Sequence, residues 1–367
     1  MRSRSVVVAV LAGATLVLAA PAQAAPVPAA PAAPTPVTEC GQTVTGPAYL
    51  AQDLVCSGEG VRVAAGGVLD LRGHTLRGAT RSDTGVALMA EGDAEVRNGR
   101  ITGFYQAVYA AGPGAKTVRG VTVEENGLGV AAFGDMFDEN QAEVRIIGST
   151  LTGNNTGVST AYLRHVEITG STVSGNNWGA EFGWSGTAVV TRSTFEDNAL
   201  GLVCSVTCTV ERSTFRSNTY EGVFQDAGDL TVRASTFADN GTGYVASFST
   251  ARIDRSTFTG NDVGVSSNAG LTLELTGSTF RGNGTGYTGE ADSWGTALDT
   301  LTGNRFVRNG DGIVSDAPDL ALGDNTATRN TGWGIHAPNA TDLGGNRASG
   351  NGNDPQCVGV DCAGSVS

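Results

Sequence analysis

Basic side chains are scarce in this 367-residue sequence, and lysine occurs once, at Lys116. Asp and Glu outnumber Lys and Arg by 36 to 23, which gives a formal net charge of −13. Nucleic acids and anionic membrane surfaces are both bound through clusters of basic side chains. The charge balance therefore argues against both as partners of this chain.

Soft metal ligands are also scarce, with three histidines and three methionines, one of which is Met1. Proteins that deliver soft or borderline metals need many such side chains. A metal-delivery role is therefore the least favoured of the functions considered below.

Long apolar runs are absent except at the N-terminus, where Val6 to Ala20 follows Arg2 and Arg4. Ala22-Gln23-Ala24 then provides a small-residue cleavage site, which is typical of a secretory signal peptide. The run is too short to indicate a membrane span. We expect residues 1–24 to be removed and the mature chain to be extracellular, without a membrane span.

The remaining chain is predicted to have three parts. Residues 25–39 are rich in Ala and Pro, a composition typical of an extended linker. Residues 40–364 are expected to form one domain, followed by a short tail at 365–367. We expect a monomer.

The six cysteines form three local pairs, Cys40/Cys56, Cys204/Cys208 and Cys357/Cys362. An even number of cysteines in an exported chain indicates disulfide bonds. The alternative is a metal site, but the two short spacings occur once each and no histidine lies near them. We therefore expect disulfides and no metal site.

The most informative feature is an internal repeat of the form Ser-Thr-Phe-x-x-Asn-x-x-Gly-aliphatic. Its asparagine recurs at spacings of 20 to 28 residues. The positions are Asn126, Asn154, Asn176, Asn198, Asn218, Asn240, Asn261, Asn283, Asn309, Asn330 and Asn351. A near-constant period of this length predicts a solenoid.

Each repeat contains two or three short alternating runs, such as Leu230 to Arg233 followed by Thr236-Phe237. High glycine and β-branched content excludes helical repeats, and leucine-rich repeats would need leucine at several fixed positions. The pattern therefore predicts an all-β, single-stranded, right-handed parallel β-helix with coils of 21 or 22 residues.

Stacked coils place equivalent residues about 4.8 Å apart. We therefore expect Phe195, Phe215, Phe237, Phe258 and Phe280 to form an interior stack, continued by Leu151, Val173 and Phe306. The asparagines should form a hydrogen-bonded ladder. The glycine that follows each asparagine is expected in a tight bend with positive φ.

Three segments of the sequence resemble segments of a known protein family. Asp53-Leu54-Val55-Cys56 with the stretch Val68 to Leu76 forms the first, Val96 to Phe104 the second, and Asn351 to Cys362 the third. They resemble secreted right-handed parallel β-helix repeat proteins of the pectate-lyase-like superfamily, including NosD-like and exported actinobacterial members. The resemblance implies the fold, but the superfamily contains lyases, hydrolases, epimerases and non-enzymes.

The catalytic motifs of its pectin-degrading branches are missing. Neither the Gly-His-Gly of polygalacturonases nor an Asp-Pro-His motif of the C5-epimerases occurs. A uronate lyase would need a base, for which Lys116 or an arginine would have to serve. The acidic surface would repel a polyuronate unless Ca²⁺ bridged the two, and Ca²⁺ is the only cofactor that the sequence suggests.

Charged residues on the strand before Ser-Thr-Phe alternate in sign between neighbouring coils. Glu211, Arg233 and Asp254 form one such column, and Arg252 and Glu274 another. Opposite charges on adjacent strands stabilise a sheet by roughly 0.2–1 kcal/mol per pair. We interpret this face as a solvated scaffold.

The strand after the asparagine turn carries the candidate catalytic pair. Glu290 and Asp316 occupy equivalent positions in successive coils, with no obvious cation between them. Two such carboxylates could share a proton or bind a cation. The alternative is a pair of exposed acids at a loop edge.

Aromatic and acidic residues cluster on the same strand in other coils. The candidate substrate-binding residues are Trp178, Glu181, Trp184, Phe224, Asp226 and Trp294. Trp294 lies in one of two inserted segments, the other being 133–139, and insertions in solenoids form loops that often border the binding face. The aromatic rings could stack on sugars or could simply be buried at turns.

Three functions follow from these features. The first is a secreted protein that binds or processes an extracellular polysaccharide, by hydrolase or lyase chemistry. The second is a non-catalytic binding or structural β-helix, which the missing motifs favour. Metal delivery of the NosD kind is third.

Overall fold

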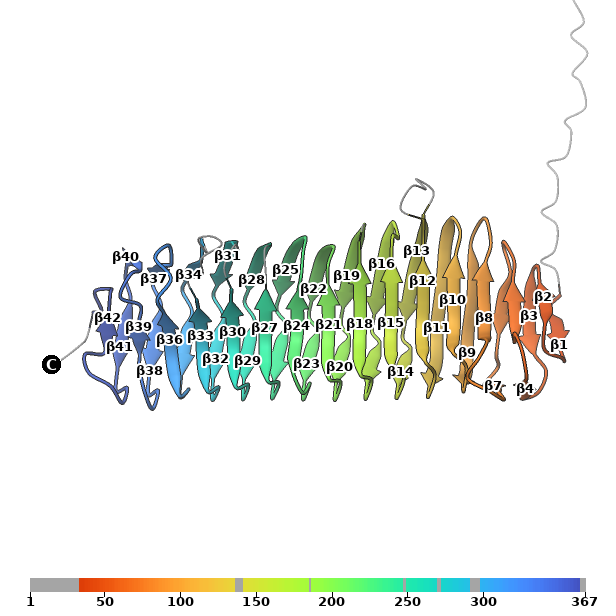
Figure 1. Ribbon diagram of the computed structural model, residues 1–367, viewed down its shortest axis with the longest axis horizontal. Helices are drawn as coiled ribbons and strands as arrows, with labels where there is room; N and C mark the ends of the chain where they lie inside the picture. The colour runs from red at the N-terminus through yellow and green to blue at the C-terminus, as the bar shows by residue number, and fades with distance from the viewer. Residues whose placement is uncertain are drawn as a thin grey trace, which may run out of the picture. The chain divides into compact units, whose positions relative to one another are not determined.

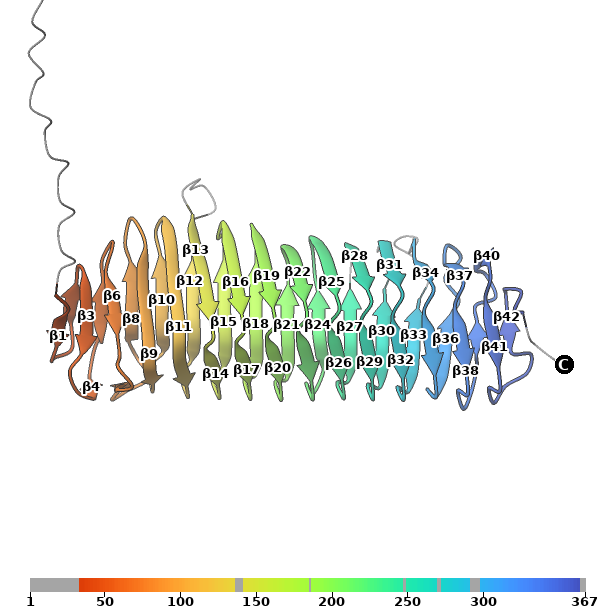
Figure 2. The same ribbon diagram turned by 180° about the vertical axis from the view of Figure 1, so that it is seen from behind.

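The structure is a computed structural model that describes residues 33–135, 141–184, 186–246, 249–268, 272–290 and 298–363. Every regular element in these ranges is a β-strand, and every pairing between strands is parallel. Successive coils stack along one axis, as Figures 1 and 2 show from opposite sides. The prediction of a parallel β-helix is confirmed.

A 15-stranded sheet runs along one face of the stack; we call it the binding-face sheet. Each coil contributes one strand to it. Its strands are β2 (Gln42–Val44), β5 (Val61–Val63), β8 (Thr84–Met89), β10 (Gln106–Ala111), β12 (Leu128–Phe133), β15 (Thr156–Ala161), β18 (Trp178–Gly183), β21 (Leu200–Cys204), β24 (Glu221–Gln225), β27 (Thr242–Ala246), β30 (Val263–Ser267), β33 (Thr285–Gly289), β36 (Asp311–Ser315), β39 (Ile335–His336) and β42 (Cys357–Val358).

A 27-stranded sheet forms the rest of the coil wall; we call it the scaffold sheet. It consists of two rows, joined where β9 (Ala94–Thr102) and β11 (Gly114–Glu124) run through both. The first row contains β1 (Thr35–Val37), β3 (Pro47–Leu50), β6 (Val68–Asp70), β13 (Ala142–Ile147), β16 (His165–Thr169), β19 (Thr187–Thr191), β22 (Thr207–Glu211), β25 (Asp229–Arg233), β28 (Thr250–Asp254), β31 (Thr272–Thr276), β34 (Thr300–Thr302), β37 (Ala321–Gly323) and β40 (Thr341–Gly344). The second row contains β4 (Leu54–Cys56), β7 (Thr75–Gly78), β14 (Thr150–Thr152), β17 (Thr172–Ser174), β20 (Thr194–Glu196), β23 (Thr214–Arg216), β26 (Thr236–Ala238), β29 (Thr257–Thr259), β32 (Thr279–Arg281), β35 (Arg305–Val307), β38 (Thr326–Thr328) and β41 (Arg347–Ser349).

The coil stack begins earlier than Cys40, where we expected the domain to start. Strand β1 pairs with β3, with Thr35 opposite Ala48 and Val37 opposite Leu50. The main-chain groups of β1 cover the exposed edge of β3, and Val37 is buried. The last residues assigned to the linker therefore extend the sheet.

The interior contains the predicted phenylalanine stack. Neighbouring rings from Phe195 to Phe306 are parallel to within 14°, with centroids 4.5–5.2 Å apart. All of these side chains are fully buried. Leu151 and Val173 continue the column towards the N-terminus, because they pair with each other and Val173 pairs with Phe195.

The asparagine ladder is also present. The amide Nδ2 of Asn198 donates to Oδ1 of Asn218 over 3.1 Å, and the same oxygen accepts the backbone N–H of Asn198. A second ladder, which the sequence did not reveal as one, lies at the other turn of the coil. It uses serine hydroxyls from Ser149 to Ser278 and then Asn304, Asn325 and Asn346.

The predicted role of the glycine after each asparagine is wrong. Gly201, Gly222 and Gly243 do not have positive φ; they are buried strand residues. A Cβ on Gly201 would lie 2.3 Å from the carbonyl oxygen of Gly222 in the next coil. Glycine is required there for close packing between coils. The positive φ belongs to the residue before the asparagine, such as Asp197 at 56°.

The three predicted disulfides are confirmed. Cys40–Cys56, Cys204–Cys208 and Cys357–Cys362 have Cα–Cα distances of 5.7, 6.6 and 6.2 Å, within the usual range for a disulfide. The first and third lie at the two ends of the coil stack. The described residues contain no helix that is long and apolar enough to cross a membrane.

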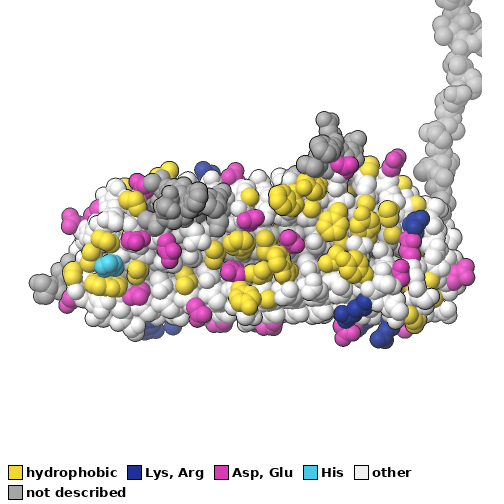
Figure 3. All heavy atoms as spheres, viewed as in Figure 1, with side chains coloured by type: hydrophobic (Ala, Val, Ile, Leu, Met, Phe, Trp, Pro, Cys, Tyr) yellow, Lys and Arg dark blue, Asp and Glu magenta, His cyan; other side chains and the backbone are white. Residues whose placement is uncertain are grey.

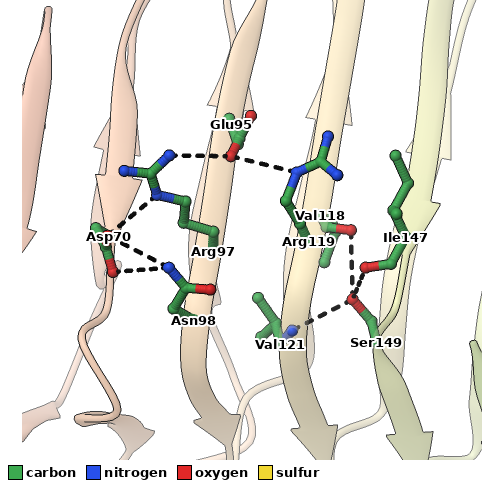
Figure 4. Close-up of polar contacts among 9 residues, drawn as sticks. All are labelled: Asp70, Glu95, Arg97, Asn98, Val118, Arg119, Val121, Ile147 and Ser149. Carbon is green, nitrogen blue, oxygen red and sulfur yellow. Dashed lines mark hydrogen bonds and ion pairs between the residues drawn. The ribbon is translucent and has the colours of Figure 1, made fainter.

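The scaffold sheet carries paired charges. Arg233 lies opposite both Glu211 and Asp254, and Arg252 lies opposite Glu274, as the alternation of sign predicted. Near the N-terminal end, Nε of Arg97 lies 3.1 Å from Oδ2 of Asp70 (Figure 4). Burial raises the pKa of Asp70, but hydrogen bonds from the Arg72 backbone, Asn98 and Arg97 outweigh it and hold this pKa below its usual value.

Candidate functional site

The outer surface of the binding-face sheet is formed by two columns of side chains. From β8 to β36 one outward residue precedes the repeat glycine, which is Ala107 in β10, and another follows it two positions later. The first column is Thr84, Gln106, Leu128, Thr156, Trp178, Leu200, Glu221, Thr242, Val263, Thr285 and Asp311. The second is Ala87, Tyr109, Ala131, Ser159, Glu181, Val203, Phe224, Val245, Ser266, Thr288, Val314 and His336.

A hollow of about 370 Å³ opens on this surface over β18, β21 and β24; we call it the aromatic hollow. Five of the six predicted substrate-binding residues line it. They are Trp178, Glu181, Trp184, Phe224 and Asp226. The sixth, Trp294, lies outside the described residues.

The local backbone explains how these side chains meet. Strand β18 turns Trp178 and Glu181 outward because the Gly179-Ala180 pair between them is buried. Trp178 lies opposite Leu200, and Glu181 lies opposite Val203, which in turn lies opposite Phe224. The hollow is therefore assembled from three neighbouring strands, each contributing to both columns.

Trp184 has a backbone conformation and a solvent exposure that are unusual for a tryptophan. Its φ of 74° is in the left-handed region, and 74% of the residue is exposed to solvent. A non-glycine residue in this region costs roughly 1–2 kcal/mol. Neither burial nor backbone preference therefore accounts for a tryptophan at this position.

The hollow also contains a carboxylate that sequence reasoning missed. Glu221 precedes the repeat glycine Gly222 and is half-buried in the wall of the hollow. Its position in the repeat is equivalent to that of Trp178, which is the signal that could have identified it. Burial raises the pKa of both Glu181 and Glu221, although a backbone hydrogen bond partly offsets the effect at Glu221.

The predicted catalytic pair lies in a second hollow, of about 390 Å³, near the C-terminal end of the same sheet. Gly289 pairs with Ser315, so Glu290 and Asp316 follow each other on neighbouring coils, as predicted. Both acids are exposed. His336 also lines this hollow, and its ring centroid lies 4.5 Å from that of Trp333.

Two further possibilities considered from the sequence are Lys116 as the base of a lyase and a bound metal ion. Nζ of Lys116 donates to the carbonyls of Ala90, Gly92 and Pro113, and the residue is fully buried. Burial lowers its pKa, but the amine closes a coil corner and cannot reach a substrate. For metals, no group of three or more His, Cys, Asp or Glu residues in the described ranges could hold an ion.

Comparisons with known proteins agree with this architecture. The family model described as "Right handed beta helix region" matches residues 84–229, 156–299 and 223–367. A comparison with curated protein sequences finds no match.

Solved structures of similar fold include two substituted forms of the periplasmic alginate epimerase AlgG. Each covers 79% of this chain and 78% of its own, with TM-scores of 0.60 and 0.52 at 13% and 12% identity. The A-module of the Azotobacter vinelandii mannuronan C-5 epimerase AlgE4 covers 89% and 91% at 15% identity, with a TM-score of 0.45. At these identities the likeness concerns the fold.

Proposed function

The chain belongs to the right-handed β-helix family, and we propose that it binds an extracellular polysaccharide on the outer surface of its binding-face sheet. The observation that carries the proposal is the aromatic hollow. There Trp178, Trp184 and Phe224 line one open depression.

Exposed aromatic groups of this kind require an explanation, because a soluble protein rarely leaves large apolar groups together at its surface. Trp184 contributes little to the core, being mostly exposed, and it occupies a backbone conformation that disfavours it. Strained positions often persist where function requires them. Flat rings beside carboxylates provide both an apolar platform and hydrogen-bond acceptors, which suits a sugar.

The shape of the coil stack supports a polymeric ligand. The binding-face sheet runs the length of the coil stack (Figure 1), and the aromatic hollow and the second hollow open on the same face. Strands β21 and β36 lie five strand positions apart, or about 24 Å at the usual spacing. An extended chain could contact both hollows at once. An alginate epimerase of this fold also acts on a glycan.

Export is part of the same proposal. A glycan outside the cell requires a secreted protein, for which residues 1–24 would supply the signal. Disulfides persist in oxidising compartments, which is consistent with three of them in this chain.

Processing of the bound glycan is a second candidate, favoured by one observation. Glu290 and Asp316 directly follow the adjacent strands β33 and β36, and both line the second hollow. Two carboxylates could provide a general acid and a base for glycoside hydrolysis. In that case Glu290→Ala or Asp316→Ala would abolish turnover while binding at the aromatic hollow remained.

Binding is tested with the mature chain from Ala25 and a panel of neutral, uronic and amino polysaccharides. Trp178→Ala should weaken binding of the recognised glycan about tenfold, as expected for the loss of an aromatic anchor. The control is Leu343→Ala, which removes an exposed apolar side chain from the scaffold sheet. Equal losses in both variants, or binding to nothing in the panel, would contradict the proposal.

Turnover is followed in the same incubations, with Ca²⁺ or with EDTA. New reducing ends without ultraviolet absorbance would identify a hydrolase and point to Glu290 and Asp316. Absorbance from unsaturated products would identify a lyase, for which an arginine would have to act as the base. Binding without either product would exclude both a hydrolase and a lyase for the glycans in the panel.

A further inference from the structure

Basic side chains are distributed unevenly between the two sheets, whereas acids occur on both. Every ion pair that an arginine makes within the described ranges lies on the scaffold sheet or its turns, except Arg62–Glu59 on β5 and the turn before it. From β8 to β39 the two outward columns of the binding-face sheet contain acids but neither Lys nor Arg. Figure 3 shows this face, with apolar side chains and carboxylates along its middle and basic side chains at its margins.

The aromatic hollow is where this imbalance is greatest. Glu181, Glu221 and Asp226 line it, and no basic residue does. Glu181 and Glu221 are half-buried, and neither makes an ion pair within the part of the chain that the structure describes. Carboxylates on the scaffold sheet, such as Asp70 and Glu274, have arginine partners instead.

The aromatic rings favour the same type of ligand for an independent reason. The face of a tryptophan or phenylalanine ring attracts a cation through its quadrupole, by roughly 0.5–2 kcal/mol depending on how far the cation is desolvated. Trp178, Trp184 and Phe224 therefore attract positive charge to the space that the carboxylates also favour. A uronate in this space would be repelled by both groups.

We propose that the polysaccharide bound in the aromatic hollow carries protonated amino groups, as polymers of glucosamine do. The inference rests on the proposed function and specifies the ligand of that same site. A protonated amine would donate hydrogen bonds to Glu181 or Glu221, while the apolar face of the sugar ring packs on the indole rings. The ligand would thus neutralise carboxylates that no basic side chain of the described residues pairs with.

The test uses two oligosaccharides that differ only in the acetylation of their amino groups: a cationic glucosamine oligomer and its uncharged, fully N-acetylated counterpart. Both are titrated into the mature protein by calorimetry at a pH where the amines are protonated. One charge-assisted hydrogen bond contributes about 1.5–3 kcal/mol, so the glucosamine oligomer should bind at least about tenfold more tightly. Added salt should reduce this advantage.

Variants that each remove one negative charge test which carboxylates cause the preference for the glucosamine oligomer. Glu181→Gln and Glu221→Gln keep the side-chain shape, and each should lower affinity for the glucosamine oligomer about tenfold. Binding of the N-acetylated oligomer should fall less in both variants, because its acetamido groups carry no positive charge. Glu274→Gln makes the same charge change on the scaffold sheet and should leave both affinities unaltered. Thermal unfolding of each variant confirms that it is folded.

The outcomes separate this inference from the proposed function. Equal or tighter binding of the N-acetylated oligomer, or of a polyuronate, overturns the amino-sugar assignment but leaves polysaccharide binding in place. Binding of an oligolysine peptide as tight as that of the glucosamine oligomer also overturns it, because the site would then recognise cations in general. Failure of every saccharide to bind removes the proposed function itself.

Discussion

The hydroxyl of Tyr287 donates a hydrogen bond to Oδ2 of Asp299 over 2.5 Å in the interior of the coil stack. Both residues are fully buried, and Oδ1 of Asp299 accepts the backbone N–H of Leu273 over 3.2 Å. Burial raises the pKa of Asp299, while its hydrogen bonds, including that from Tyr287, partly offset the rise. A carboxyl group is thus held inside the solenoid, and no basic side chain of the described residues forms an ion pair with it.

Asp299 should make stability depend on pH. Because its pKa is higher in the folded chain than in the unfolded chain, its stabilising contribution is complete below the unfolded pKa. That contribution is lost as the pH rises through the folded pKa. The asparagine in the Asp299→Asn variant cannot ionise. Between the unfolded and the folded pKa of Asp299, the unfolding free energy of this variant should therefore fall less steeply with pH than that of the parent protein. Urea unfolding at a series of pH values measures this. Identical pH slopes for the two proteins would show that Asp299 does not titrate with folding.

The asparagine ladder should be the most sensitive polar element of the coil. Asn218→Ala removes the acceptor of two Asn198 N–H groups and the donor to Phe195 and Asn240, all in the interior. Buried groups left without partners cost about 1–3 kcal/mol each, so we expect a loss of several kcal/mol in unfolding free energy.

The matched control for the ladder is Asn177→Ala, which changes the exposed neighbour of Asn176 in the same kind of turn. It should alter stability by less than about 0.5 kcal/mol, as is usual for surface positions. Denaturant unfolding compares the two variants. Similar losses in both would mean that the turn conformation, and not the ladder, determines stability.

The phenylalanine stack should tolerate a change of shape better than a loss of volume. Phe237 lies between Phe215 and Phe258, with ring centroids at 5.2 and 4.6 Å. Phe237→Ala leaves a cavity and should cost about 3–5 kcal/mol. Phe237→Leu refills most of that volume and should cost about 1–2 kcal/mol. If denaturant unfolding gave the two variants equal stability, the packing of this column would be less tight than the ring distances imply.

Substitution of Trp184 should weaken glycan binding without lowering the stability of the fold. Its positive φ is readily adopted by glycine, and its exposed ring contributes little to the core. Trp184→Gly should therefore leave the melting temperature unchanged or raise it slightly, while it weakens glycan binding. Calorimetric titration and thermal unfolding of the same preparation measure both quantities. A large fall in melting temperature would show that the tryptophan is a packing residue.

Much of the fold was predictable because, in a solenoid, a residue's neighbour in space is the equivalent residue one coil away in the sequence. The spacing of Asn198 and Asn218 thus predicts their hydrogen bond, and the same spacing predicts the stacking of Phe195 on Phe215. The disulfides were predictable for a different reason, because the paired cysteines are only 16, 4 and 5 residues apart in the sequence. Trp178, Glu181 and Phe224 could be grouped in advance because they occupy equivalent strands.

Other features depended on the shape of the coil, which the repeat pattern does not describe. The sequence shows a glycine after each asparagine, but only the distance from Gly201 to the Gly222 carbonyl shows that a Cβ would not fit. It shows a single lysine, but only the coil corner directs Lys116 onto three carbonyls and away from solvent. The acidity of the chain is evident from its composition. The tertiary structure alone decides that arginines neutralise the scaffold sheet and leave Glu181 and Glu221 beside the tryptophans, because the turns of the coil determine which face each strand presents.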